Sequence, residues 1–192
     1  MIETEKGIPN FQQNGYLPYK CYEVTLNEIK EKLVDNFPDS KTRQSRFECF
    51  MRFYKDLLKN VKSCIRILID GSFVENEQNP NDIDFVIILD STKYNDYEKF
   101  YLHNEFEFKR VLRDEFKLLK EQKNFEVMYK SDFFKYGCDF FPVVKEEKNS
   151  KDYSSYMGLK RYWIKQWGHD RHHVEKGFLN LKVNYEEDFN EI

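Results

Sequence analysis

Hydrophobic and polar positions along this chain follow two spacings, which predict strands in some stretches and helices in others. Short apolar runs bounded by Gly, Pro or Asn indicate strands at 65–69, 82–90, 125–129, 138–144 and 178–183. Apolar residues three or four positions apart predict helices at 25–34, 40–62 and 156–167, and a helical region that starts at 95 or 96.

Two of the helix starts carry a local signal. Thr25-Leu-Asn-Glu28 is a capping box, in which the two end residues satisfy each other's exposed main-chain N–H groups. Ser40 can cap the next helix, and Arg43 and Arg46 lie near the start of that helix. A solvated helix face is favoured for these two arginines over contact with a phosphate.

The most informative stretch runs from 64 to 90, where two predicted strands flank a polar loop. The second strand carries Asp82 and Asp84, separated only by Ile83. Side chains alternate between the two faces of a strand, so both carboxylates project from the same side. Two carboxylates about 4 Å apart repel by roughly 1 to 4 kcal/mol, and a divalent cation such as Mg²⁺ turns this repulsion into attraction.

Gly71 and Ser72, at the end of the first strand, suit a phosphate group. Glycine lets another group approach the main chain closely, and the hydroxyl and N–H groups that follow can hold a phosphate. The pattern therefore predicts a triphosphate at Gly71 and Ser72, with metal ions at Asp82 and Asp84.

Asp139 lies inside the apolar run at 138–144, in which Pro142 limits the strand to a sheet edge or a strand end. A buried carboxylate without a partner is costly, so Asp139 needs one. A metal shared with Asp82 and Asp84 is the simplest candidate. Glu126 can take the place of Asp139 as the third acid, and an ion pair between Asp139 and an Arg or Lys remains the structural alternative.

Four residues near the C-terminus, His169, Asp170, His172 and His173, suggest a metal site at first sight. Adjacent histidines in a strand point in opposite directions, and no helical pair four residues apart occurs here, so a metal site is disfavoured. Arg171 and Lys176 are better candidates, as cations that reach a triphosphate or an acceptor. Surface charge explains them equally well.

Composition narrows the class of protein. The 192 residues suit one domain, and 18 Phe and 13 Tyr predict a core rich in rings. The chain has neither a membrane-spanning apolar run nor a signal peptide, so we expect a cytoplasmic protein. Four scattered cysteines predict buried free thiols, and the net charge of −3 disfavours extended DNA binding.

The spacing of Gly71-Ser72, nine intervening residues and Asp82-Ile-Asp84 resembles the signature of the nucleotidyltransferase superfamily, which has the fold of polymerase beta. The chain also looks like an uncharacterised bacterial family of stand-alone, single-domain proteins similar to the minimal nucleotidyltransferases of toxin–antitoxin systems. The stretches that carry this likeness are N-G-Y-L-P at 14–18, I-D-G-S-F at 69–73, P-N-D-I-D at 80–84, and Y-W, G-H-D-R and K-G within 162–177.

The resemblance implies an α+β fold with a small mixed β-sheet flanked by helices, and a third carboxylate, for which we take Asp139. It implies one domain over 1–192, divided into an extended arm, a helical lead-in, a catalytic core and a C-terminal helix and strand, at 1–20, 21–62, 63–145 and 150–192. We expect the arm to pack on the body of the protein.

The activity implied by the resemblance is a Mg²⁺- or Mn²⁺-dependent transfer of a nucleoside monophosphate from a nucleoside triphosphate to a protein or tRNA, in a toxin–antitoxin or phage-defence setting. Asp82, Asp84 and Asp139 would hold the metal ions, while Ser72 and the neighbouring main chain hold the β and γ phosphates. A catalytically silent module that binds a nucleotide or a partner protein is the alternative. A nucleic-acid-binding protein is a further alternative, which the acidic charge disfavours.

Overall fold

The computed structural model of this chain describes residues 2–102 and 138–185, apart from the side chain of Asp139. The expected strand at 125–129 with Glu126, the turn before Gly137, and the part of the expected helical region beyond residue 102 lie outside the described residues. The beginning of that region is confirmed, because residues 96–102 are helical.

The described strands form one mixed, six-stranded sheet with the order β1-β2-β6-β3-β4-β5. β3 runs antiparallel to both of its neighbours, whereas the other neighbouring pairs are parallel. The protein therefore belongs to the α+β class. The strands are β1 (Thr4–Lys6), β2 (Cys21–Val24), β3 (Cys64–Asp70), β4 (Ile83–Asp90), β5 (Cys138–Lys145) and β6 (Phe178–Lys182).

Three predicted strands are confirmed as β3, β4 and β5, and β5 ends the described strand order, as Pro142 requires of an edge strand. The last predicted strand is also present, but β6 lies in the middle of the sheet, between β2 and β3. β1 and β2 were not predicted. The expected extended arm over 1–20 contains β1, and the expected helical lead-in over 21–62 begins with a strand.

The first helix begins where its sequence signal places it, whereas α2 begins at Arg43 with Thr42, not the expected Ser40, as its N-cap. The capping box is present, since Thr25 Oγ1 accepts a hydrogen bond from the main-chain N–H of Glu28 at 3.2 Å, and the Glu28 carboxylate accepts one from the N–H of Thr25 at 2.8 Å. The helices are α1 (Leu26–Lys30), continued by the π-helical η1 (Glu31–Asp35), then α2 (Arg43–Asn60), the 3₁₀ turn η2 (Ser72–Val74) and α5 (Tyr153–Trp167).

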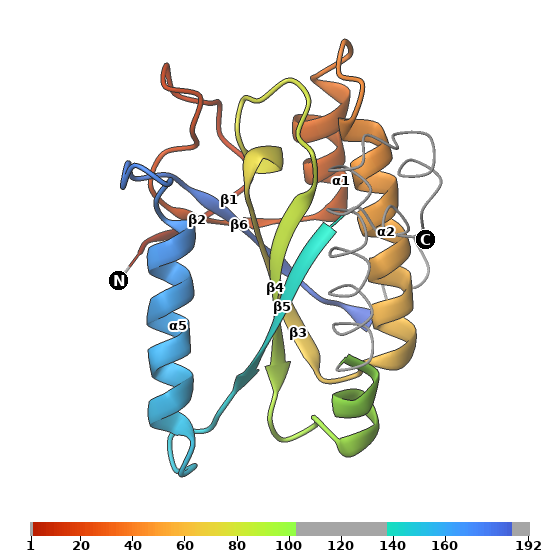
Figure 1. The fold of residues 1–192 in the computed structure, drawn as a ribbon, viewed down its shortest axis with the longest axis vertical. Helices are drawn as coiled ribbons and strands as arrows, with labels where there is room; N and C mark the ends of the chain where they lie inside the picture. The colour runs from red at the N-terminus through yellow and green to blue at the C-terminus, as the bar shows by residue number, and fades with distance from the viewer. Residues whose placement is uncertain (1, 103–137, 186–192) are drawn as a thin grey trace, which may run out of the picture.

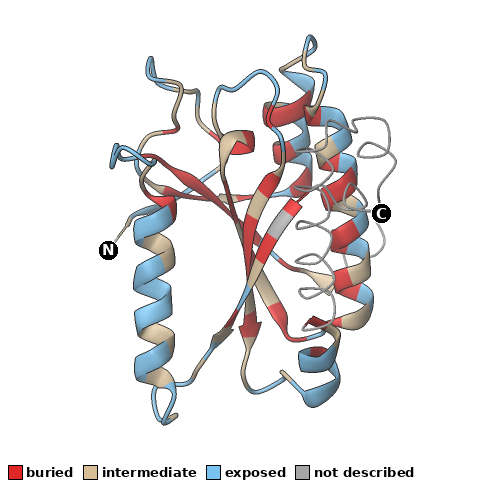
Figure 2. Ribbon diagram, viewed as in Figure 1, coloured by how far each residue is buried: buried red, intermediate tan, exposed pale blue. Residues whose placement is uncertain are grey.

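The sheet separates two layers of helix, as Figure 1 shows, with α1 and α2 on one face and α5 on the other. Rings fill the space under α2, where Phe85 of β4 lies 5.3 Å from Phe50, 4.9 Å from Phe53 and 5.9 Å from Phe140, measured between ring centroids. On the other face, α5 is the helix that covers the sheet, and Figure 2 shows that most of α5 is exposed. Trp163 of α5 contacts Phe141 of β5 at 4.8 Å.

The N-terminal arm packs on the body, as expected. Leu17 is fully buried, and its carbonyl accepts a hydrogen bond from the N–H of Gly177 at 3.0 Å. The carbonyl of Gly15 accepts another from the N–H of Asn76 at 2.9 Å. The arm thus ties two loops together at one end of the sheet.

Two side-chain expectations have opposite outcomes. All four cysteines are buried free thiols, as predicted. The expected solvated face at the start of α2 is wrong for Arg43, whose side chain is fully buried. Within residues 2–102 and 138–185, no helix has the length and apolar character needed to cross a bilayer.

We expect Phe85→Ala to lower the free energy of unfolding by about 3 to 5 kcal/mol, because it removes a fully buried ring that contacts three others. Urea denaturation measures the change. Phe100→Ala is the matched control, since Phe100 is 67% exposed and its loss should change stability by less than about 0.5 kcal/mol. Equal effects of the two substitutions would contradict the assignment of this core.

Candidate functional site

Acidic residues from three neighbouring strands meet at one end of the sheet. β3 ends at Asp70, which pairs with Asp84 near the start of β4, and Asp84 pairs on its other side with Asp139 near the start of β5. The main-chain register therefore places Asp70, Asp84 and Asp139 in one row across β3, β4 and β5. Neighbouring strands in a sheet lie about 4.7 to 4.9 Å apart.

The corner after β3 brings Gly71 against Asp84. Gly71 has φ +79°, a conformation that residues with a side chain rarely adopt. A β-carbon on Gly71 would overlap the carboxylate of Asp84, so the Asp84 side chain occupies the space that glycine leaves open. The corner and the second acid of the Asp82/Asp84 pair are thus in direct contact.

The other residues of the predicted site lie close to this corner along the chain. Ser72 begins η2 directly after Gly71, and Asp82 immediately precedes β4. Ser72, Asp82 and Asp84 are all partly exposed, so solvent reaches them. Among the side chains that the structure describes, no group of three His, Cys, Asp or Glu is arranged to hold a metal ion. The side chain of Asp139 lies outside that description, so a site made of Asp82, Asp84 and Asp139 remains a prediction.

Lys176 is buried beside two acids. Its Nζ lies 3.0 Å from Asp70 Oδ1 and 2.7 Å from Glu75 Oε1, and its side chain is only 6% exposed. The ammonium group therefore joins the end of β3 to the loop after η2, in place of the free surface cation that the sequence allowed. With both carboxylates already paired to it, Lys176 reaches a triphosphate only if these ion pairs rearrange.

Burial and charge act in opposite directions on this group of residues. Burial raises the pKa of Asp70 to about 7, and the nearby Lys176 opposes the shift. Burial also disfavours the charged form of Lys176, but Asp70 and Glu75 outweigh it and raise the pKa of Lys176 above its ordinary value. The ammonium group of Lys176 therefore stabilises the buried carboxylate of Asp70 in its charged form.

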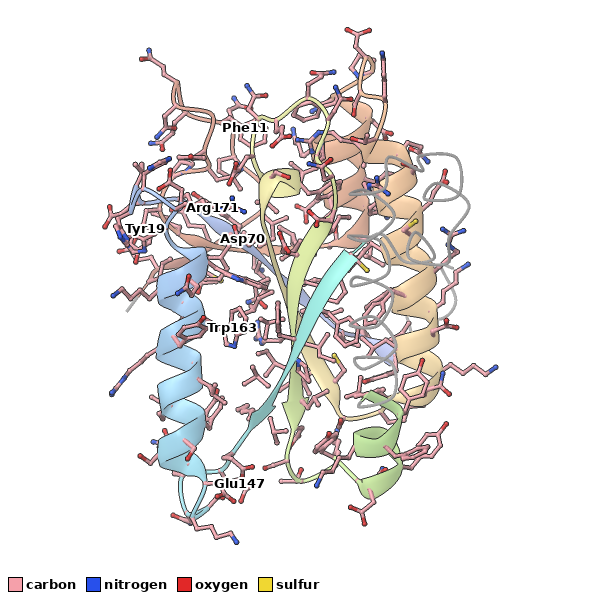
Figure 3. The ribbon with its side chains drawn as sticks, in the orientation of Figure 1. Phe11, Tyr19, Asp70, Glu147, Trp163 and Arg171 are labelled. Atoms are coloured by element: carbon pink, nitrogen blue, oxygen red, sulfur yellow. The ribbon has the colours of Figure 1, made fainter. Side chains whose placement is uncertain are left out.

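Arg171 lies in an exposed loop whose shape Asp170 determines. The Asp170 carboxylate accepts hydrogen bonds from the N–H groups of His172 and Val174, both at 2.8 Å, and from the hydroxyl of Tyr16 at 2.8 Å. Figure 3 shows Arg171 at the same end of the sheet as Asp70. Arg171 is thus exposed near the candidate site, without a demonstrated contact to it.

The histidines near Arg171 have structural contacts. His169 packs against the ring of Tyr19, with centroids 5.5 Å apart, and its Nδ1 lies 3.0 Å from the carbonyl oxygen of Lys165. His173 adopts φ 63° at the turn. None of these residues belongs to a metal-type cluster among the described side chains.

Asp70 and Glu75 are the residues of this region that sequence reasoning missed. The sequence did contain one signal for Asp70, which is its position directly after the apolar run 65–69. An acid at the end of such a strand is often buried, and a buried carboxylate is costly unless a cation or a hydrogen-bond donor pairs with it. The partner could not be found, since Lys176 is more than a hundred residues away in the chain.

We predict that Lys176→Met makes stability depend more steeply on pH. Without the ammonium group the pKa of Asp70 rises further, and an acid with a higher pKa in the folded than in the unfolded chain destabilises the fold as the pH rises above about 4. Relative to the parent protein, the free energy of unfolding should fall as the pH rises above about 7, because Asp70 ionises near that pH in the parent and stays protonated in the variant. Urea denaturation at several pH values measures it.

Asp70→Asn combined with Lys176→Met is the control for this experiment. Glu75, which also faces Lys176, is retained in both variants, so their difference isolates Asp70. The double variant should lose most of the added pH dependence. A stability loss in Lys176→Met that is the same at both ends of the pH range would refute the prediction.

A second prediction concerns the glycine corner. Gly71→Ala should cost at least about 1 kcal/mol, because alanine is strained at this φ and its β-carbon displaces the Asp84 carboxylate. Gly158→Ala is a matched control, since Gly158 lies inside α5 with nothing near its would-be β-carbon. This substitution should stabilise the protein by up to about 1 kcal/mol. Thermal denaturation compares the two, and an unchanged or raised melting temperature for Gly71→Ala would contradict the contact.

Comparison with known proteins places the chain in a family. No curated protein and no solved structure matches it. A family model matches residues 9–182. This range contains the strands β2 to β6 and the residues Gly71, Asp82, Asp84 and Asp139. The chain therefore belongs to DUF6932, a family of unknown function.

Proposed function

We propose that this protein is a metal-dependent nucleotidyltransferase with the nucleotidyltransferase fold, which transfers a nucleoside monophosphate from a nucleoside triphosphate to a protein or a tRNA. The observation that carries the proposal is the contact between Gly71 and the Asp84 carboxylate. That contact joins a strand-end glycine suited to a phosphate with an acid suited to a metal ion.

The register of the sheet gives further support. Asp139 follows Asp84 in the row across β4 and β5, so two strands bring acids from distant parts of the chain to neighbouring positions. The donor set of Asp82, Asp84 and Asp139 consists of carboxylate oxygens, which are the ligands that Mg²⁺ and Mn²⁺ prefer. These three residues would hold the metal, and Gly71 and Ser72 would hold the phosphates.

The proposed reaction forms one bond and breaks one. The oxygen of an acceptor hydroxyl bonds to the α-phosphorus, and the bond from that phosphorus to the oxygen that bridges the α and β phosphates breaks. Pyrophosphate leaves with that oxygen, and the proton of the hydroxyl passes to solvent. A bound Mg²⁺ would polarise the α-phosphate and neutralise charge on the leaving pyrophosphate. The contribution of the chain is to position the triphosphate and to hold the charges that stabilise it.

The proposed setting is the cytoplasm, where nucleoside triphosphates and tRNA are available, as part of a toxin–antitoxin or phage-defence system. Arg171 is a candidate for contact with the triphosphate or the acceptor, because it is exposed at the same end of the sheet as Asp70. Lys176 could serve the triphosphate only after releasing Asp70 or Glu75.

Incubation with each α-labelled triphosphate, Mg²⁺ or Mn²⁺ and cell extract tests the reaction. We expect label on a protein or RNA band, and Asp84→Asn should reduce it at least about 100-fold, because the amide cannot hold the metal as a carboxylate does. Asp90→Asn is the matched control. Asp90 lies at the opposite end of β4, where its carboxylate accepts hydrogen bonds from Thr92 that the amide oxygen can keep.

Treatment of the labelled band with protease or ribonuclease identifies the acceptor as protein or RNA. Equal labelling by the parent, Asp84→Asn and Asp90→Asn would exclude the proposed site. Binding of triphosphate that depends on metal, with no label transferred, would favour a catalytically silent nucleotide-binding module. Binding of tRNA or DNA that is salt-sensitive and independent of metal would favour a nucleic-acid-binding protein.

A further inference from the structure

The β3–β4 loop, residues 71–82, carries both parts of the candidate site. It begins with Gly71 and Ser72 and ends with Asp82, two residues before Asp84. The distance between the phosphate-binding and metal-binding groups therefore depends on the conformation of this one loop. A residue that fixes the conformation of this loop therefore also fixes the spacing between these two groups, even if it does not contact the ligand.

Arg43, in the first turn of α2, holds the loop by its main chain. The Nη1 of Arg43 donates to the carbonyl of Phe73 at 2.8 Å, and its Nη2 donates to the carbonyls of Glu75 and Glu77, each at 2.6 Å. Its Nε donates to Glu77 at 3.1 Å. One planar guanidinium thus binds three alternate carbonyls of the loop.

The same guanidinium also anchors the loop to the helical layer. Nη1 makes a second hydrogen bond, to the carbonyl of Leu33 in η1, at 2.8 Å. The carbon at the centre of the guanidinium lies 3.8 Å from the centroid of the Phe37 ring, a position typical of a cation–π contact. Arg43 therefore joins η1, the chain between η1 and α2, and the β3–β4 loop.

Burial excludes a direct role in phosphate binding for Arg43. The side chain is fully buried, and the hydrogen bonds that the structure describes for its guanidinium all go to main-chain carbonyls. Burial lowers its pKa to about 10, which still leaves the group charged at neutral pH. A buried charge is stable only when its donors are satisfied, and the loop carbonyls satisfy them.

Other contacts hold the remaining parts of the loop. The N–H of Val74 donates to the carbonyl of Gly71 at 3.0 Å, and the Phe73 carbonyl that Arg43 binds lies within the same turn, η2. On the other side, Lys176 binds the Glu75 side chain, and Asn79 accepts a hydrogen bond from the N–H of Lys41 at 2.7 Å. Arg43 binds the stretch between these contacts.

We infer that Arg43 is a positioning residue, which orders residues 73–77 and thereby sets the spacing between the Gly71–Ser72 corner and the acids Asp82 and Asp84. Its consequence for affinity rests on the proposed function, because a loop that is held in place binds a metal–triphosphate without a further cost of ordering. Arg43 acts without touching the ligand. Lysine cannot replace it, since a single ammonium group lacks the planar set of donors that reaches several carbonyls at once.

Hydrogen exchange tests the ordering of the loop in Arg43→Lys. The N–H groups of Val74, Glu75 and Asn76 are hydrogen-bonded in the structure, and in the variant they should exchange at least about tenfold faster. Arg52→Lys is the matched control, because Arg52 is an exposed arginine on the same helix, and it should leave the loop unchanged. Circular dichroism checks that both variants remain folded.

Calorimetry with inorganic tripolyphosphate and Mg²⁺ tests the effect on affinity without assuming a base. We expect Arg43→Lys to bind at least about tenfold more weakly than the parent protein and Arg52→Lys to bind equally well. If Arg43→Lys does not fold, Phe37→Leu weakens the same contact while keeping Arg43, and it should show the same two changes to a smaller degree.

The outcomes separate this inference from the proposed function. Parent-like exchange at residues 74–76 in a folded Arg43→Lys variant overturns the inference, and so does faster exchange combined with unchanged tripolyphosphate affinity. If the parent protein binds no tripolyphosphate in the presence of Mg²⁺ but exchange is faster in the variant, the proposed function fails, and the role of Arg43 in ordering the loop is retained.

Discussion

The candidate site depends on one constraint: the Asp84 carboxylate occupies the space that a β-carbon on Gly71 would fill. It requires a residue without a side chain at the end of β3 and a left-handed main-chain conformation there. It also requires that β3 and β4 pair in the register that puts Asp70 opposite Asp84. A slip of one residue would turn Asp84 to the other face of the sheet and separate it from the corner.

Two buried cations support this arrangement in different ways. Lys176 is a compact charge that binds two carboxylates, which lets an acid at the end of β3 remain in the interior. Arg43 is a planar donor that binds main-chain carbonyls, which fixes the path of a loop rather than the charge of a neighbour. The partly exposed acids Asp82 and Asp84 lie at the corner that these two cations support.

The sequence predicts the parts of the fold whose signals are local. β3 and β4 are apolar runs with clear boundaries, and the capping box at Thr25 acts within four residues. β1 and β2 are only three and four residues long, and they join the rest of the sheet only through the pairing of β2 with β6, so no local pattern distinguishes them from an extended arm. The burial of Arg43 was missed because helical spacing identifies apolar faces and cannot show that a loop from elsewhere covers a charged residue.

The central place of β6 has a consequence for the order in which the molecule assembles. β6 joins β2 to β3, and the pairing of Cys21 with Phe178 links residues that are far apart in the sequence. During synthesis from the N-terminus, the β1–β2 pair cannot attach to the rest of the sheet until residues 178–182 have left the ribosome. Such distant pairings slow folding, because a long loop must close before they stabilise anything. A segment that is synthesised late is therefore the one that joins β1 and β2 to the rest of the sheet.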